Sequence, residues 1–74
     1  MIMARLVKLM RVEEYADPSK DFEIYVNSEY VQCIMDEDKK YKIVELTLHG
    51  RFINVRGELD EIALKLSSQS KRIY

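Results

Sequence analysis

A two-residue turn at His49-Gly50 separates two runs of strand-forming residues in this chain. The runs, Tyr41–Leu48 and Arg51–Arg56, are rich in β-branched and aromatic residues, which favour strands. Gly50 supplies the positive φ that a tight hairpin turn requires, and histidine is among the residues that tolerate such a φ. The pattern predicts an antiparallel β-hairpin over these two runs.

Three further strands are predicted before this hairpin. Residues Arg5–Val12 alternate with period 2, although a helix through Leu6, Leu9 and Met10 remains open. Phe22–Val26 also alternates, and Val31–Met35 is a third apolar run.

The segments between these strands carry residues typical of turns. A long loop is expected at Glu13–Asp21, where Pro18 interrupts any regular element. Asn27 is expected to cap a short turn before the third strand. We expect the acidic run Asp36–Asp38, followed by two lysines, to form a solvated hairpin tip.

The segment after Gly57 has helical periodicity. Leu59, Ile62, Ala63 and Leu66 follow the spacing i, i+3, i+4, i+7, which places them on one face of a helix. Acidic residues at the start of this segment suit the positive end of a helix dipole. The sequence therefore predicts an α+β fold, a small antiparallel sheet of four to five strands with one C-terminal amphipathic helix packed on it.

The length of 74 residues limits the chain to a single small domain, residues 1–74, with a frayed tail expected at 67–74. A domain of this size buries only roughly 60% of the surface that its unfolded chain exposes. Cys33 is the one cysteine, so no intramolecular disulfide can form, and a reducing, cytoplasmic compartment is expected. No apolar run approaches the roughly 18 residues of a membrane span, so no membrane partner is expected.

The net charge of −1 is unevenly distributed. Residues 21–40 hold six acidic and two basic side chains, which makes the middle of the chain acidic. Binding to nucleic acid requires a basic face, so we do not expect nucleic acid as a partner.

No residue pattern in the chain predicts catalysis. His49 is the single histidine, and its position beside Gly50 is explained by the turn. Cys33 lies in a predicted strand next to an acidic run, so we expect it to be buried and unreactive. The run Asp36–Asp38 lacks the spacing and the turn glycine of a calcium loop. We expect no enzyme activity, no metal site and no cofactor.

The stretch from Val26 to Leu66 resembles two bacterial families. The resemblance is carried by these segments: Val26-Asn27-Ser28, Val31, Ile34, Leu46–Arg51, Val55-Arg56-Gly57 and Glu58–Ile62. It is similar to the small FlbD-like motility-associated proteins, which implies a small, non-enzymatic accessory protein. It is similar also to the core of LytTR-type DNA-binding domains, although the basic strand that follows the helix there is reduced to Lys71-Arg72-Ile73-Tyr74.

The leading hypothesis is a non-catalytic interaction module, of bacterial or phage type, that binds a protein partner or itself. We expect five residues on a second, uncovered strand face to make the contact: Val7, Leu9, Tyr25, Ile43 and Ile53. A symmetric homodimer is expected, held chiefly by the first strand as an exposed sheet edge. The alternative is a DNA-binding module of LytTR-like type, with phosphate contacts from Arg51, Arg56, Lys65, Lys71 and Arg72.

Overall fold

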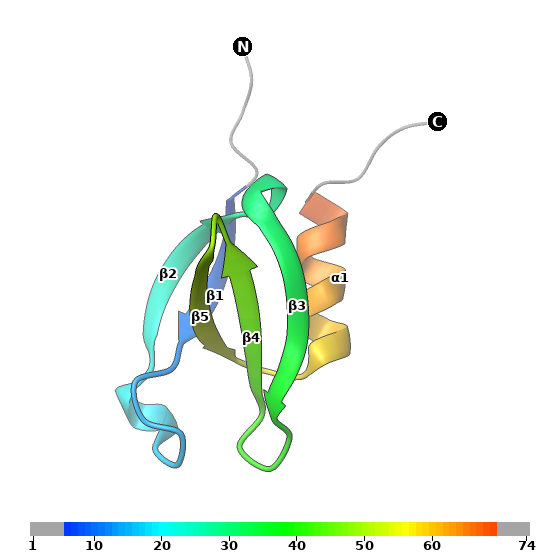
Figure 1. The fold of residues 1–74 in the computed structure, drawn as a ribbon. Coiled ribbons are helices and arrows are strands. Elements are labelled where there is room, and N and C mark those ends of the chain that lie inside the picture. The colour runs from blue at the N-terminus through cyan, green and yellow to red at the C-terminus, as the bar shows by residue number, and fades with distance from the viewer. Residues whose placement is uncertain (1–5, 70–74) are drawn as a thin grey trace.

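The computed structural model describes residues 6–69, which form five strands and one α-helix (Figure 1). In chain order the elements are β1 (Leu6–Arg11), the 3₁₀ turn η1 (Pro18–Lys20), β2 (Phe22–Asn27), the 3₁₀ turn η2 (Ser28–Tyr30), β3 (Val31–Asp38), β4 (Ile43–Leu48), β5 (Arg51–Arg56) and α1 (Leu59–Gln69). This arrangement confirms the predicted α+β class, with five antiparallel strands and a helix packed on the sheet.

The strands form one antiparallel sheet in the order β2-β1-β5-β4-β3. β1 therefore lies inside the sheet, hydrogen-bonded to β2 on one side and to β5 on the other. The prediction that the first strand forms an exposed edge is wrong, because β1 pairs with β2 on one side and with β5 on the other. The two edges of the described sheet are β2 and β3.

The sheet consists of two parts that meet at a short junction. β1 and β2 form a hairpin with an unbroken register from Leu6↔Asn27 to Arg11↔Phe22. β3, β4 and β5 form a meander. The two parts pair only at Arg11↔Val55, next to a hydrogen bond of 2.9 Å from the Val12 amide to the Asn54 carbonyl. The hairpin and the meander therefore share little main-chain bonding.

The turn between β4 and β5 has the geometry that the sequence predicts. His49 and Gly50 both have positive φ, at 51° and 78°, and the strands pair without interruption from Leu48↔Arg51 to Ile43↔Arg56. Positive φ at both central residues is characteristic of the tight turns that match the twist of the flanking strands. The predicted hairpin is confirmed, with its first strand starting at Ile43 instead of Tyr41.

The strand β3 is longer than predicted. It continues through the acidic run to Asp38, so this run belongs to a strand and the turn is formed by residues 39–42. The Asp38 carboxylate accepts hydrogen bonds from the amides of Lys40 and Tyr41, at 3.0 and 3.2 Å. Asp38, which the sequence predicts to lie in the hairpin tip itself, therefore ends β3 and caps the turn at residues 39–42.

The helix α1 covers the core with the predicted face. Ile62 and Leu66 are buried, and Leu59 packs against the same cluster, in which Val44, Leu46 and Val55 are fully buried. α1 contacts β1, β3 and η2, and Figure 1 shows it alongside β3. It extends to Gln69 and so includes the first residues of the predicted tail, while residues 70–74 lie outside the described part. Between residues 6 and 69, no helix is long and apolar enough to cross a membrane.

Gly57 allows the helix to approach the end of β5 closely. Its φ is 147°, and a Cβ atom at this position would lie 3.0 Å from Cδ1 of Ile62. Its amide donates to the Lys42 carbonyl at 2.7 Å. The glycine that ends the strand therefore also makes room for the most deeply buried helical side chain.

Replacing Ile62 by aspartate is expected to unfold the domain. Ile62 is 1% exposed, so the substitution places an unpaired charge in the core. This costs about 3–5 kcal/mol, comparable to the total stability of about 5 kcal/mol expected for a small domain. Urea unfolding followed by circular dichroism measures the effect.

Leu64→Asp is the matched control, because Leu64 lies on the same helix and is 68% exposed. We expect it to cost less than about 1 kcal/mol, mainly through helix propensity. Asp60→Ala, also off the buried face, should likewise have a small effect. A cooperative melt of Ile62→Asp close to that of Leu64→Asp would show that α1 is not packed as described.

Candidate interaction surface

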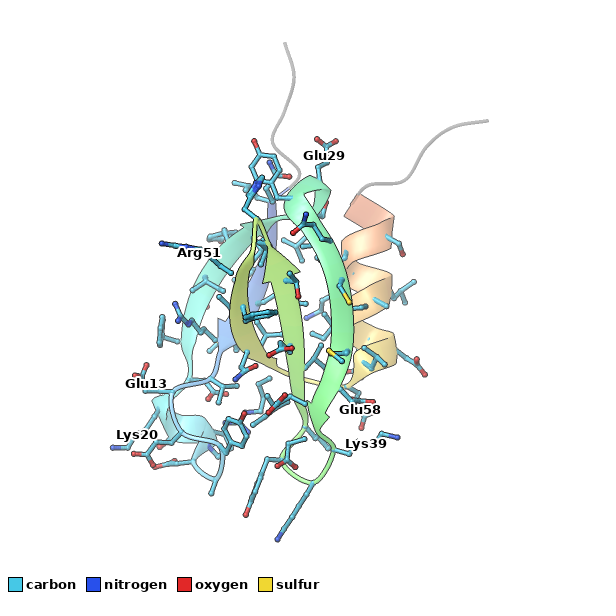
Figure 2. The ribbon with its side chains drawn as sticks, viewed as in Figure 1. Glu13, Lys20, Glu29, Lys39, Arg51 and Glu58 are labelled. Carbon is cyan, nitrogen blue, oxygen red and sulfur yellow. The ribbon has the colours of Figure 1, made fainter. Side chains whose placement is uncertain are left out.

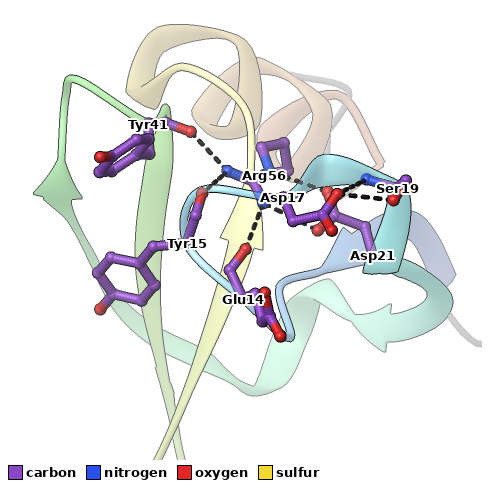
Figure 3. A network of polar contacts seen from close by, with 7 residues as sticks. All are labelled: Glu14, Tyr15, Asp17, Ser19, Asp21, Tyr41 and Arg56. Atoms are coloured by element: carbon purple, nitrogen blue, oxygen red, sulfur yellow. Dashed lines mark hydrogen bonds and ion pairs between the residues drawn. The ribbon is translucent and has the colours of Figure 1, made fainter.

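The most extensively bonded side chain among the described residues is that of Arg56 in β5 (Figure 3). Its Nε and one terminal nitrogen donate to the two carboxylate oxygens of Asp21, at 2.8 and 2.9 Å. The remaining N–H groups donate to the main-chain carbonyls of Tyr15, Tyr41 and Glu14, at 2.8, 2.7 and 3.0 Å. All five guanidinium donors are therefore used, which a lysine ammonium could not reproduce.

The ion pair between Arg56 and Asp21 is mostly removed from solvent. The two side chains are 14% and 5% exposed, respectively. The hydrogen bond with Asp21 raises the pKa of Arg56, although partial burial opposes this effect. A guanidinium already bonded on every N–H has no donor to offer a DNA phosphate, so Arg56 does not fit the role that the DNA-binding alternative gives it.

The loop that Arg56 binds is also ordered by its own side chains. Asp17 accepts hydrogen bonds from the amide and the hydroxyl of Ser19, at 3.1 and 2.6 Å. Pro18 occupies the first turn of η1, where a missing N–H costs nothing. The Asp-Pro-Ser sequence therefore builds a short capped turn that leads directly into Asp21 and β2.

Tyr15 links the same loop to β3 on the other side of the meander. Its hydroxyl donates to the Glu37 carboxylate at 3.0 Å and accepts from the side-chain Nδ2 of Asn54 at 3.4 Å. The hydrogen bond to the Glu37 carboxylate is the main reason that the pKa of Tyr15 is raised. Oδ1 of Asn54 is buried and has no hydrogen-bond partner within residues 6–69. The loop thus contacts the meander through one phenol and one guanidinium.

β2 and β3 differ as sheet edges. β2 pairs with β1 over six consecutive positions without a bulge, and Glu23 is its one charged residue. β3 has register irregularities at Val31/Cys33 and at Asp36/Asp38, and it ends in three acidic residues. Bulges and charges are the devices that protect an edge from pairing, so β3 is protected and β2 is not.

The outer face of the β1–β2 hairpin carries exposed apolar side chains. Tyr25, Leu6 and Met10 are 63%, 49% and 37% exposed. Tyr25 lies directly opposite Lys8 in the register, with Leu6 and Met10 two residues away from Lys8 on the same face. Lys8 in turn forms a salt bridge of 3.6 Å with Glu23. This face and the β2 edge together are called the hairpin surface below.

The five residues predicted to contact a partner differ in their exposure to solvent. Val7, Leu9 and Ile43 are 5%, 2% and 0% exposed, so placing them on an uncovered face is wrong. Ile53 is partly buried and packs against the core. Tyr25 alone among them is well exposed and belongs to the hairpin surface. Burial of Val7 and Leu9 follows from the interior position of β1, because its inward face is covered by the core.

Two other predicted positions are settled by the structure. Cys33 is exposed, so the prediction that it is buried is wrong; it lies opposite Thr47, whose other neighbour is the exposed Phe52. His49 adopts the expected positive φ, and its ring packs edge-on against Tyr30 with centroids 4.7 Å apart.

A hollow lies beside the start of α1. Lys39, Lys42 and Glu58 are among the residues that line it. Figure 2 shows Lys39 and Glu58 at the same end of the molecule, and Lys42 pairs with Glu58 at 3.5 Å. Its charges are largely compensated within the chain, so it does not form a strong site for an ion of either sign.

The basic residues of the DNA-binding alternative do not gather around one groove. Arg51 lies at the β4–β5 turn, and Lys65 lies on α1. Figure 2 shows Arg51 at the opposite end of the sheet from Lys39. Lys71 and Arg72 lie outside the described residues.

Replacing Arg56 by lysine is expected to destabilise the domain by about 2–4 kcal/mol, because a buried carboxylate and several carbonyls lose their donors. Denaturant unfolding at neutral pH measures this loss. Arg51→Lys is the matched control in the same strand, since Arg51 is exposed, and should change stability by less than about 0.5 kcal/mol. Equal stabilities of the two variants would contradict the role given to Arg56.

Replacing Tyr15 by phenylalanine is expected to change how stability depends on alkaline pH. The folded-state pKa of Tyr15 is raised above 10.0, so its stabilising effect is complete below pH 10 and is lost as pH rises through the folded-state pKa. The parent should therefore be more stable than Tyr15→Phe by a constant amount below about pH 10, and the difference should shrink above it. Urea unfolding of both proteins at several pH values measures this difference, in which the other titrating groups cancel. A difference that stays constant to high pH would contradict the Tyr15–Glu37 contact.

Comparison of the chain with profiles of known protein families, with curated proteins and with solved structures found no match. The resemblances to FlbD-like proteins and to LytTR-type domains therefore rest on the quoted residues alone.

Proposed function

We propose that this chain is a non-catalytic interaction module that binds a polypeptide strand along the open edge of β2. The observation that carries the proposal is the contrast between the two sheet edges. β2 is regular and almost free of charge, whereas β3 is bulged and acidic. A regular edge offers a row of unpaired N–H and C=O groups that an added strand can satisfy.

Side chains next to the edge supply contacts that main-chain pairing alone lacks. Tyr25 is an exposed aromatic residue on β2, and Leu6 and Met10 flank it on the outer face. Tyrosine and methionine are enriched where proteins meet, since both bury a large apolar area. Phe22, 42% exposed at the start of β2, adds a second aromatic ring at this edge.

The start of the edge strand is held rigidly. Asp21, which directly precedes β2, is bound on both oxygens by Arg56. A strand fixed before a partner arrives loses less conformational entropy on binding, which favours affinity. These features support main-chain pairing at the β2 edge over binding through an uncovered sheet face, because Val7, Leu9 and Ile43, which that face would need, are buried.

Selection from a random displayed-peptide library on the sparsely immobilised protein tests the proposal. We expect extended peptides that bind at micromolar concentration and shift the amide resonances of residues 22–27, with β3 resonances unchanged. N-methylation of those alternate peptide amides that face β2 should abolish binding, because each removes a main-chain donor. N-methylation on the opposite edge of the same peptide is the control.

Two results would contradict the proposal. One is a set of bound peptides whose resonance shifts map to β3 or α1. The other is that the library yields no binding peptide although the protein is monomeric in solution, so that its β2 edge is not occupied by a second copy.

A further inference from the structure

We infer that the strand bound by β2 is β2 of a second copy of this chain, so that two hairpins join into one continuous sheet about a two-fold axis. This inference rests on the proposed function and names its partner. Antiparallel pairing of two identical strands is isologous, the arrangement of the commonest closed assemblies.

The side-chain pattern of β2 restricts the register of such a pairing. Residues that face each other across an antiparallel pair lie on the same side of the sheet. The two-fold axis must therefore run midway between one residue of β2 and the same residue of the other copy. An axis at Ile24 places Ile24 opposite its own copy, Phe22 opposite the partner copy of Val26, and Glu23 opposite the partner copy of Tyr25. The core-side positions then match apolar residues with apolar residues.

The Ile24 register also satisfies the one charge of β2. The Glu23 carboxylate would lie beside the Tyr25 hydroxyl of the other copy, which can donate a hydrogen bond to it, and the two-fold axis produces this contact twice. An axis at Glu23 instead sets two glutamates against each other, and an axis at Tyr25 sets the two Tyr25 rings against each other and Glu23 opposite Asn27. The Ile24 register is therefore the one of these three that gives each Glu23 a tyrosine hydroxyl of the other copy.

The contacts of Tyr25, Glu23 and Phe22 within one chain leave their side chains accessible for pairing with a second β2 strand. Tyr25 is 63% exposed, and Glu23 contacts Lys8 at 3.6 Å while keeping 60% of its side chain exposed. Phe22 is 42% exposed, with the Arg11 guanidinium 6.0 Å from its ring centre. Pairing would cover the exposed ring of Phe22 with the partner's strand, which removes apolar area from water.

Light scattering behind a sizing column tests the inference on the full chain. We expect a mass twice the 8.8 kDa of the chain at concentrations above the micromolar range, falling toward 8.8 kDa on dilution. Tyr25→Glu should raise the dimer dissociation constant about tenfold or more, because two pairs of like charges then meet at the interface. Within one chain the new glutamate lies opposite Lys8, so the fold should be retained.

Two further variants make the result specific. Phe52→Glu is the matched control, because Phe52 is 64% exposed on β5, away from the β2 edge, and it should leave the dissociation constant unchanged. Adding Glu23→Lys to Tyr25→Glu should restore the dimer, since each lysine then faces a glutamate of the other copy. Circular dichroism of every variant shows that the domain is folded.

The outcomes separate this inference from the proposed function. A parent that stays monomeric at high concentration overturns the inference, while peptide binding at β2 would still support the proposed function. A dimer broken by Phe52→Glu and insensitive to Tyr25→Glu also overturns it, because the interface would then lie on the meander.

Discussion

The bonds of Arg56 connect the two parts of this small sheet. The β1–β2 hairpin and the β3–β5 meander pair only at Arg11↔Val55, which leaves their relative position weakly fixed by the main chain. Arg56 lies at the end of the meander and binds Asp21 from the loop that joins β1 to β2, together with carbonyls on both sides. A planar group with five fixed donors can hold such a junction, because it binds one carboxylate and three main-chain carbonyls at the same time.

The position of the hairpin determines which surface is left open. Once Arg56 holds the loop against the meander, the inward face of β1 is directed into the core, where Val7 and Leu9 are buried beneath α1 with Ile62 and Leu66. β2 becomes the edge because β1 has partners on both sides. The exposed apolar side chains of β1 are thus those on its outer face, because the side chains on its inward face are buried in the core.

Local patterns in the sequence predicted which strands and helix form better than they predicted which strands lie next to each other. Alternation, Gly50 and the spacing of Leu59, Ile62 and Leu66 act over a few residues, and the elements they indicate are all present. Strand order depends on pairings between distant residues, so the edge position of β1 was predicted wrongly. The Arg56–Asp21 pair spans 35 residues and has no local signal. The exposure of Cys33 likewise depends on which face of β3 the core covers.

The same ion pair that joins the two halves also shapes the proposed binding edge. Asp21 is held on both oxygens and Phe22 follows it directly, so the first residue of β2 begins at a fixed point. At the other end, Asn27 caps η2 by accepting from the Glu29 amide at 2.9 Å. A strand anchored at both ends keeps its unpaired edge in register, whereas a strand free at one end would fray and lose the alignment that pairing requires. The stability of the junction and the proposed recognition at the β2 edge therefore both depend on the Arg56 guanidinium.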